Sequence, residues 1–89
     1  MPGKILVIDD EESIRFTFQR NLTKEGYAVT TVADYASALE QIASEAFDLI
    51  FADILLPDLH SGIDILREIG NQGLHCPVIM ITGVPELDT

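Results

Sequence analysis

Three aspartates directly follow two short apolar runs of this chain. Asp9 and Asp10 come after residues 4–8, and Asp53 comes after residues 48–52. If the two runs are neighbouring parallel strands, their carboxyl ends meet at the edge of the sheet where α/β proteins bind ligands. Three carboxylates within about 4–6 Å of one another would repel by roughly a few kcal/mol per pair at an effective dielectric constant near 20.

Either a raised pKa or a bound hard cation relieves such repulsion. Mg²⁺ prefers a few carboxylates together with waters and phosphate oxygens, and this cluster supplies the carboxylates. Acids are also ordinary residues at the start of a helix, which is the plainer interpretation of an isolated Asp9-Asp10 pair. The coincidence with Asp53, and with Thr82 after a further apolar run, favours a site for Mg²⁺ or Mn²⁺.

The elements that would position these residues alternate between strand and helix. Short β-branched apolar runs predict strands, and the run at 48–52 is typical of a central strand buried on both faces. Asp34 and Ser61-Gly62 are the expected starts of the second and third helices, and Gly26 ends the first. The predicted strands are 4–8, 27–32, 48–52 and 77–82, and the first predicted helix is 13–25.

Apolar residues at helical spacing predict the inward face of each helix. The expected inward residues are Ile14, Phe18 and Leu22 in the first helix, Ala38, Leu39, Ile42 and Ala43 in the second, and Ile63, Leu66 and Ile69 in the third.

This order predicts an α/β fold. Strands that alternate with helices through short connections imply a doubly wound parallel sheet built from right-handed crossovers. The length of 89 residues allows one core, so we expect one domain.

The composition excludes several functional classes. Five Lys and Arg against 15 Asp and Glu give a net charge of −10, which repels nucleic acids and anionic membranes and attracts divalent cations. No stretch resembles a transmembrane helix or a signal peptide, so we expect a soluble, cytoplasmic protein. The single cysteine, Cys76, is expected to be a buried, inert thiol.

Three motifs in this order resemble the receiver domain of two-component response regulators, and the resemblance extends over the whole chain. It implies a flavodoxin-like sheet with strand order 2-1-3-4, from which the fifth strand and last helices of the family are missing. The motifs are Ile5-Leu6-Val7-Ile8-Asp9-Asp10-Glu11, Asp48-Leu49-Ile50-Phe51-Ala52-Asp53-Ile54-Leu55-Leu56-Pro57 and Val78-Ile79-Met80-Ile81-Thr82-Gly83.

The resemblance implies a role for each site residue. Asp53 would be the phosphoacceptor, which takes a phosphoryl group from a phosphohistidine of a sensor histidine kinase or phosphotransfer protein. Asp10 and Asp53 would bind Mg²⁺ directly, and Asp9 would bind it through a water. The backbone carbonyl of Leu55 would be a further ligand, and the Thr82 hydroxyl would donate to a phosphoryl oxygen.

Two features depart from the family pattern. The stretch 58–61 is one residue longer than usual, which could displace the start of the third helix. His60 in this stretch is expected to be a solvated loop residue, with a place at the mouth of the site as the alternative. The family's phosphoryl-pairing lysine and aromatic switch residue, both on its fifth strand, have no counterpart, because neither Lys4 nor Lys24 matches.

Three functions compete. The first is a phosphoacceptor switch, not a dedicated enzyme, that controls an attached or separate output domain. The second is a phosphatase of the haloacid-dehalogenase type, but Glu11 stands where its second Asp is needed and Asp53 would have no role. The third is a receiver-like docking module without phosphotransfer, which is expected if the full protein also lacks the lysine.

The last apolar run, 78–81, would form an edge strand without a charge or an internal proline, and such an edge invites aggregation or strand exchange. We therefore expect residues 1–89 to be a C-terminally incomplete part of a receiver domain about 120 residues long. If the chain were the whole polypeptide, a homodimer would cover this edge.

Overall fold

Seven elements alternate between strand and helix in the computed structural model, which describes residues 3–54, 56 and 60–81. The alternation confirms the prediction from sequence, and the boundaries of the predicted strands and of the first helix differ from the observed ones by at most one residue at each end. The elements are β1 (Lys4–Ile8), α1 (Glu12–Lys24), β2 (Ala28–Val32), α2 (Tyr35–Ser44), β3 (Leu49–Asp53), α3 (Gly62–Asn71) and β4 (Val78–Ile81).

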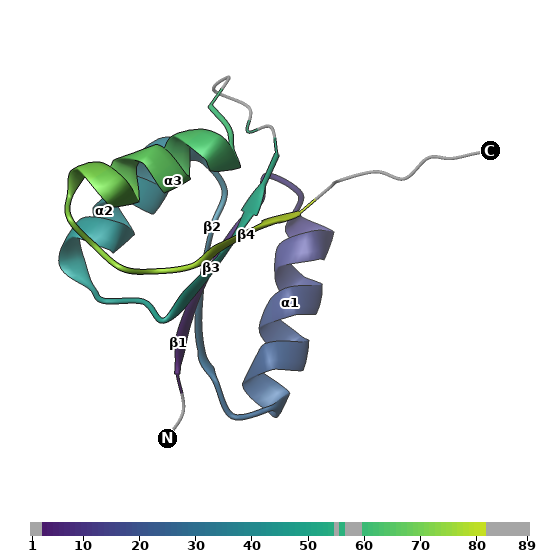
Figure 1. Cartoon of the computed structure of the whole chain (residues 1–89). Helices are drawn as coiled ribbons and strands as arrows, with labels where there is room; N and C mark the ends of the chain where they lie inside the picture. The colour runs from purple at the N-terminus through teal and green to yellow at the C-terminus, as the bar shows by residue number, and fades with distance from the viewer. Residues whose placement is uncertain (1–2, 55, 57–59, 82–89) are drawn as a thin grey trace.

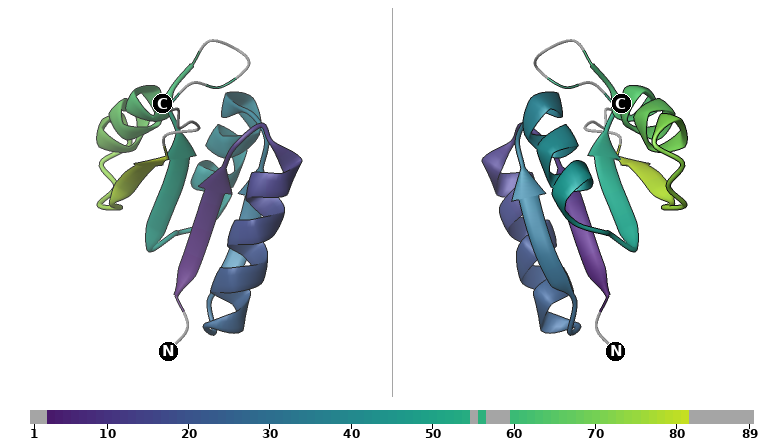
Figure 2. Two further views of the ribbon diagram at one scale, coloured as in Figure 1. Left: turned by 90° about the vertical axis from the view of Figure 1, so that its right-hand side faces the viewer. Right: turned by 90° about the vertical axis from the view of Figure 1, so that its left-hand side faces the viewer.

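The four strands form a parallel sheet with the order β2-β1-β3-β4, as predicted. Helix α1 covers one face of this sheet, and α2 and α3 cover the other (Figure 1). The two side views show the strands running side by side between these layers (Figure 2). The arrangement is the flavodoxin-like, doubly wound sheet expected from the sequence. Among the described residues, β4 is the strand at one edge.

The main core lies between the sheet and the pair α2 and α3. Burying one side chain of this size contributes roughly 1.5–3 kcal/mol, so this layer is the principal source of stability for the strands that carry the aspartates. Its buried members are Leu6, Ile8, Ala38, Ile42, Ile50, Ala52, Leu56, Ile65 and Ile69.

Strand β3 is fully buried on one face only, which corrects the expectation of burial on both. Ile50 and Ala52 are buried, whereas Leu49 and Phe51 on the other face are half-buried. Phe51 packs against Phe18 of α1, with ring centroids 5.1 Å apart. None of the residues of α1 is itself fully buried. A single helix of modest apolarity therefore shields this face incompletely within the described part of the chain.

The predicted inward face of α1 is confirmed in direction, because Ile14, Phe18 and Leu22 are its half-buried apolar residues. In α2 the structure confirms Ala38 and Ile42, which are buried.

The prediction for the other two inward residues of α2 is partly wrong. Leu39 is half-buried, and Ala43 is exposed. Ala43 follows the buried Ile42 by one residue, which turns it about 100° away from the core.

The predicted inward face of α3 is wrong for two of three residues. Ile69 is buried as expected, but its partner is Ile65, whereas Ile63 is 60% and Leu66 is 49% exposed. A capping box between Ser61 and Asp64 fixes where the helix begins. Ile63 and Leu66 each follow a buried residue by one position, which turns them about 100° away from the sheet.

Gly62 permits the first turn of α3 to lie close against the sheet. The residue is buried, and a Cβ atom added to it would collide with Sδ of Met80 and lie 3.3 Å from Cβ of Ala52. A side chain at this position would force the Met80 thioether to move and would crowd the Cβ atom of Ala52. Glycine therefore favours the close approach here.

Cys76 is partly buried, and it packs against the core cluster. This burial raises the pKa of its thiol above the ordinary value. A raised pKa keeps the sulfur protonated at neutral pH, in line with the expected inert thiol. No helix in the described part of the chain combines the length and the apolarity that crossing a membrane requires.

We predict that Gly62→Ala lowers the free energy of unfolding by about 1–3 kcal/mol, because the added methyl group lies 3.3 Å from Cβ of Ala52 and also displaces the Met80 thioether. Gly70→Ala in the same helix is the matched control. A Cβ atom at Gly70 meets no atom within 4 Å, so this change is expected to stabilise by up to about 1 kcal/mol. Urea denaturation measures both values. Equal or higher stability of Gly62→Ala would contradict the close approach.

Candidate metal centre at the strand ends

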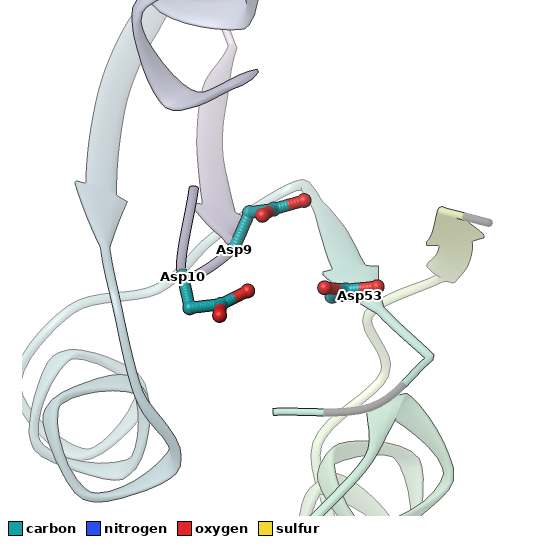
Figure 3. Close-up of side chains that lie close together, drawn as sticks. All are labelled: Asp9, Asp10 and Asp53. Carbon is teal, nitrogen blue, oxygen red and sulfur yellow. The ribbon is translucent and has the colours of Figure 1, made fainter. Parts of the chain in front are cut away.

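The three predicted aspartates converge at the carboxyl ends of β1 and β3. Asp9 and Asp10 follow the last residue of β1, and Asp53 is the last residue of β3. Pairing of Ile8 with Ala52 brings these ends side by side. One carboxylate oxygen from each aspartate lies within 4.8 Å of those of the other two. Figure 3 shows the three side chains gathered between the two strands.

Hydrogen bonds hold Asp9 on three sides. Its amide donates to the carbonyl of Val32 on β2 at 3.1 Å. Its Oδ1 accepts from the amide of Glu11 at 2.9 Å, and its carbonyl oxygen accepts from Nη1 of Arg15 at 2.7 Å. The Asp9 side chain is buried, with 1% of its surface exposed. The turn from β1 into α1 is therefore held in one geometry.

The three carboxylates differ in their access to solvent. Asp10 is exposed, Asp53 is partly buried and Asp9 is buried. One oxygen of Asp9 is already engaged by the Glu11 amide. Asp10 and Asp53 are thus the residues that an entering ion or substrate meets first, and the division between direct and water-mediated ligands stays a prediction.

Burial is the main cause that raises the pKa of Asp9 above its ordinary value. The hydrogen bond from the Glu11 amide acts in the opposite direction, and the neighbouring charges of Asp53, Asp10 and Glu11 raise the pKa further. An ionised Asp9 is therefore disfavoured in the folded chain without a counter-ion. Three oxygens at this spacing form the donor set that Mg²⁺ or another hard divalent cation accepts in proteins.

Two predicted site residues, Leu55 and Thr82, lie outside the described residues. Their assignments therefore stay predictions. Lys4 lies at the opposite end of β1, where Nζ pairs with Glu45 at 3.0 Å. Lys24 lies in the last turn of α1. As predicted, neither lysine is at the cluster.

The structure adds two features that the sequence did not indicate. Arg15 contacts the cluster through the Asp9 carbonyl. The only sign of this contact in the sequence is a basic residue in the first turns of the helix that follows Asp10. His60 is half-buried, and its ring stacks on that of Tyr35 with centroids 3.8 Å apart. This corrects the expectation of a solvated histidine, because the Tyr35 ring at the start of α2 covers the His60 ring.

The chain belongs to the response regulator receiver domain family, whose model matches residues 5–89. It is therefore a receiver domain of the two-component response regulator type, with the CheY-like fold of that family. The match includes the stretches that carry all three aspartates.

The relatives extend beyond this chain. The chain is 43% identical over 86 residues to the alkaline phosphatase synthesis transcriptional regulatory protein PhoP of Bacillus subtilis. The aligned region covers 97% of this chain and 35% of PhoP. The chain thus spans about a third of the length of the curated relatives it matches.

Solved structures give the same classification. The chemotaxis response regulator CheY4 of Vibrio cholerae superposes with a TM-score of 0.87 and 30% identity, over 97% of this chain and 72% of that one. The response regulator TrrA of Thermotoga maritima, in complex with Mg²⁺-BeF, superposes with a TM-score of 0.83 and 33% identity, over 92% of this chain and 70% of TrrA.

We predict that Asp9→Asn raises the melting temperature at pH 7 in the absence of metal by a few degrees. The raised pKa means that the folded state binds this proton more tightly than the unfolded state does. Ionisation of Asp9 therefore lowers the free energy of unfolding as the pH rises above the ordinary value of 3.8. Asparagine carries no such charge and keeps an oxygen for the Glu11 amide.

The advantage of Asp9→Asn should shrink as the pH falls below that value, because Asp9 then becomes neutral in both states. Thermal unfolding at several pH values measures the trend. Glu40→Gln removes one charge from an exposed position on α2 and is the control, with a much smaller effect. A variant that is less stable at pH 7, or a difference that does not change with pH, would contradict the electrostatic account.

Proposed function

We propose that this receiver domain is a phosphoacceptor switch. Asp53 accepts a phosphoryl group from a phosphohistidine of a sensor histidine kinase or phosphotransfer protein, and the modified domain then controls an output domain. The observation that carries the proposal is the convergence of Asp53 with Asp9 and Asp10, with one oxygen of each within 4.8 Å. A single strand-end acid would not need two further acids beside it.

The chemistry of the step follows from the placement of Asp53. A carboxylate oxygen of Asp53 forms a bond to phosphorus while the bond from phosphorus to the imidazole nitrogen of the donor breaks, and the imidazole leaves with a proton from solvent. Asp53 is partly buried at the end of an internal strand, and this restricted position supports an in-line approach to its carboxylate. In this proposal Thr82 donates a hydrogen bond to a phosphoryl oxygen.

The residues fit a bound Mg²⁺. Asp10 and Asp53 would hold the ion directly, Asp9 would hold it through a water, and the Leu55 carbonyl would complete the protein ligands. When bound, Mg²⁺ neutralises the charge on the phosphoryl oxygens. The structure of TrrA in complex with Mg²⁺-BeF supports this ligand for the family fold. The domain assists its own modification and is not proposed to turn over a separate substrate.

We predict that the full-length protein, incubated with acetyl phosphate and Mg²⁺, gains one phosphoryl group and that Asp53→Asn abolishes this gain. Intact mass and peptide mapping measure the modification. Asp48→Asn is the matched control, because Asp48 lies at the other end of the same strand and accepts the amide of Lys4 at 2.8 Å. Asparagine keeps an acceptor there, so labelling should be unchanged.

Persistent labelling of Asp53→Asn would overturn the assignment of the phosphoacceptor. Mg²⁺ binding to the wild-type protein without any labelling, also from a histidine kinase, would favour the docking module instead.

A further inference from the structure

We propose that Arg15 is a positioning residue for the metal site, acting through the backbone of Asp9. The inference rests on the proposed function, since it assigns Arg15 a part in holding the same Mg²⁺ site. Arg15 lies in the first turns of α1, and its guanidinium Nη1 donates to the carbonyl oxygen of Asp9 at 2.7 Å. The contact spans from the helix back to the strand end.

The carbonyl that Arg15 binds belongs to the peptide unit between Asp9 and Asp10. This unit is planar, so fixing its oxygen also fixes the direction in which the chain enters Asp10. Asp10 is exposed, and packing therefore does little to hold it. The anchored peptide therefore constrains where the Cα atom of Asp10, from which the carboxylate projects, lies relative to Asp53.

The hydrogen bonds around Asp9 constrain complementary parts of that residue. The bond to Val32 fixes its amide, and the bond from Glu11 fixes its carboxylate. The bond from Arg15 fixes its carbonyl. Without Arg15 the peptide that leads into Asp10 loses its one described side-chain anchor, while the first two bonds remain. The loss should therefore affect the ligand geometry more than the fold.

A positioning role and a charge role of Arg15 predict opposite results. Arg15 is a cation near a cation site, so removal of its charge alone would strengthen Mg²⁺ binding. Removal of the carbonyl anchor would weaken it, because partners that orient metal ligands typically contribute about 10–100-fold in affinity. The sign of the change therefore separates the two roles.

The test is the Mg²⁺ dissociation constant of the full-length protein, measured by isothermal titration calorimetry. We expect Arg15→Met to weaken binding by about tenfold and Arg15→Lys, which keeps a long cationic donor, to restore most of the affinity. Arg20→Met is the matched control, because Arg20 is an exposed cation on the same helix. It removes the same charge and should leave the affinity within about twofold of the wild type.

Met and Arg have similar helix propensities, so Arg15→Met should fold, as its melting temperature without Mg²⁺ will show. Arg15→Gln is a second variant, since its shorter side chain cannot span the same distance, and it should show the same weakening. Unchanged or tighter binding in Arg15→Met and Arg15→Gln would overturn the inference and leave the proposed function intact. A wild-type protein that binds no Mg²⁺ would overturn both.

Discussion

The repulsion among three carboxylates is the constraint on which the site depends. The register of β1 against β3 forces Asp9 and Asp10 to lie beside Asp53. Rotation of a single side chain would separate its charge from the other two, but those two charges would remain side by side. The layer of buried aliphatic side chains between the sheet and the pair α2 and α3 holds the strands in place despite this cost. The folded domain thus keeps a concentrated negative charge that a cation or a modification can neutralise.

Several elements around the cluster each hold a different part of it. Strand β2 and the first turn of α1 hold Asp9 through its amide, carboxylate and carbonyl. Gly62 lets α3 pack closely on β3 and β4, and so supports the strand that ends in Asp53. Asp10 is the most exposed of the three aspartates. A buried, a partly buried and an exposed carboxylate at one point suit a site that must be preorganised and still accessible.

The strand order and the aspartate cluster were predictable because apolar runs and strand-end acids are local signals. The face of α3 was not predictable, since Ile63 and Leu66 are three residues apart and Ile65 and Ile69 are four apart, and both spacings place two residues on one face of a helix. The capping box of Ser61 and Asp64 sets where the helix begins, and Gly62, Ile65 and Ile69 are the residues that it buries. The contacts of Arg15 with Asp9 and of His60 with Tyr35 also depend on how loops fold back, which residue spacing does not encode.

A localised site and a diffuse acidic surface are both compatible with a net charge of −10. Titration of the protein with substoichiometric Mn²⁺, followed by ¹H–¹⁵N NMR, separates them. If the three carboxylates form one site, the amide signals of Asp10 and Asp53 lose intensity first, and those of Glu25 and Glu45, away from these strand ends, persist. Equal loss at Glu25 and Glu45 would contradict the claim that the strand ends bind the ion.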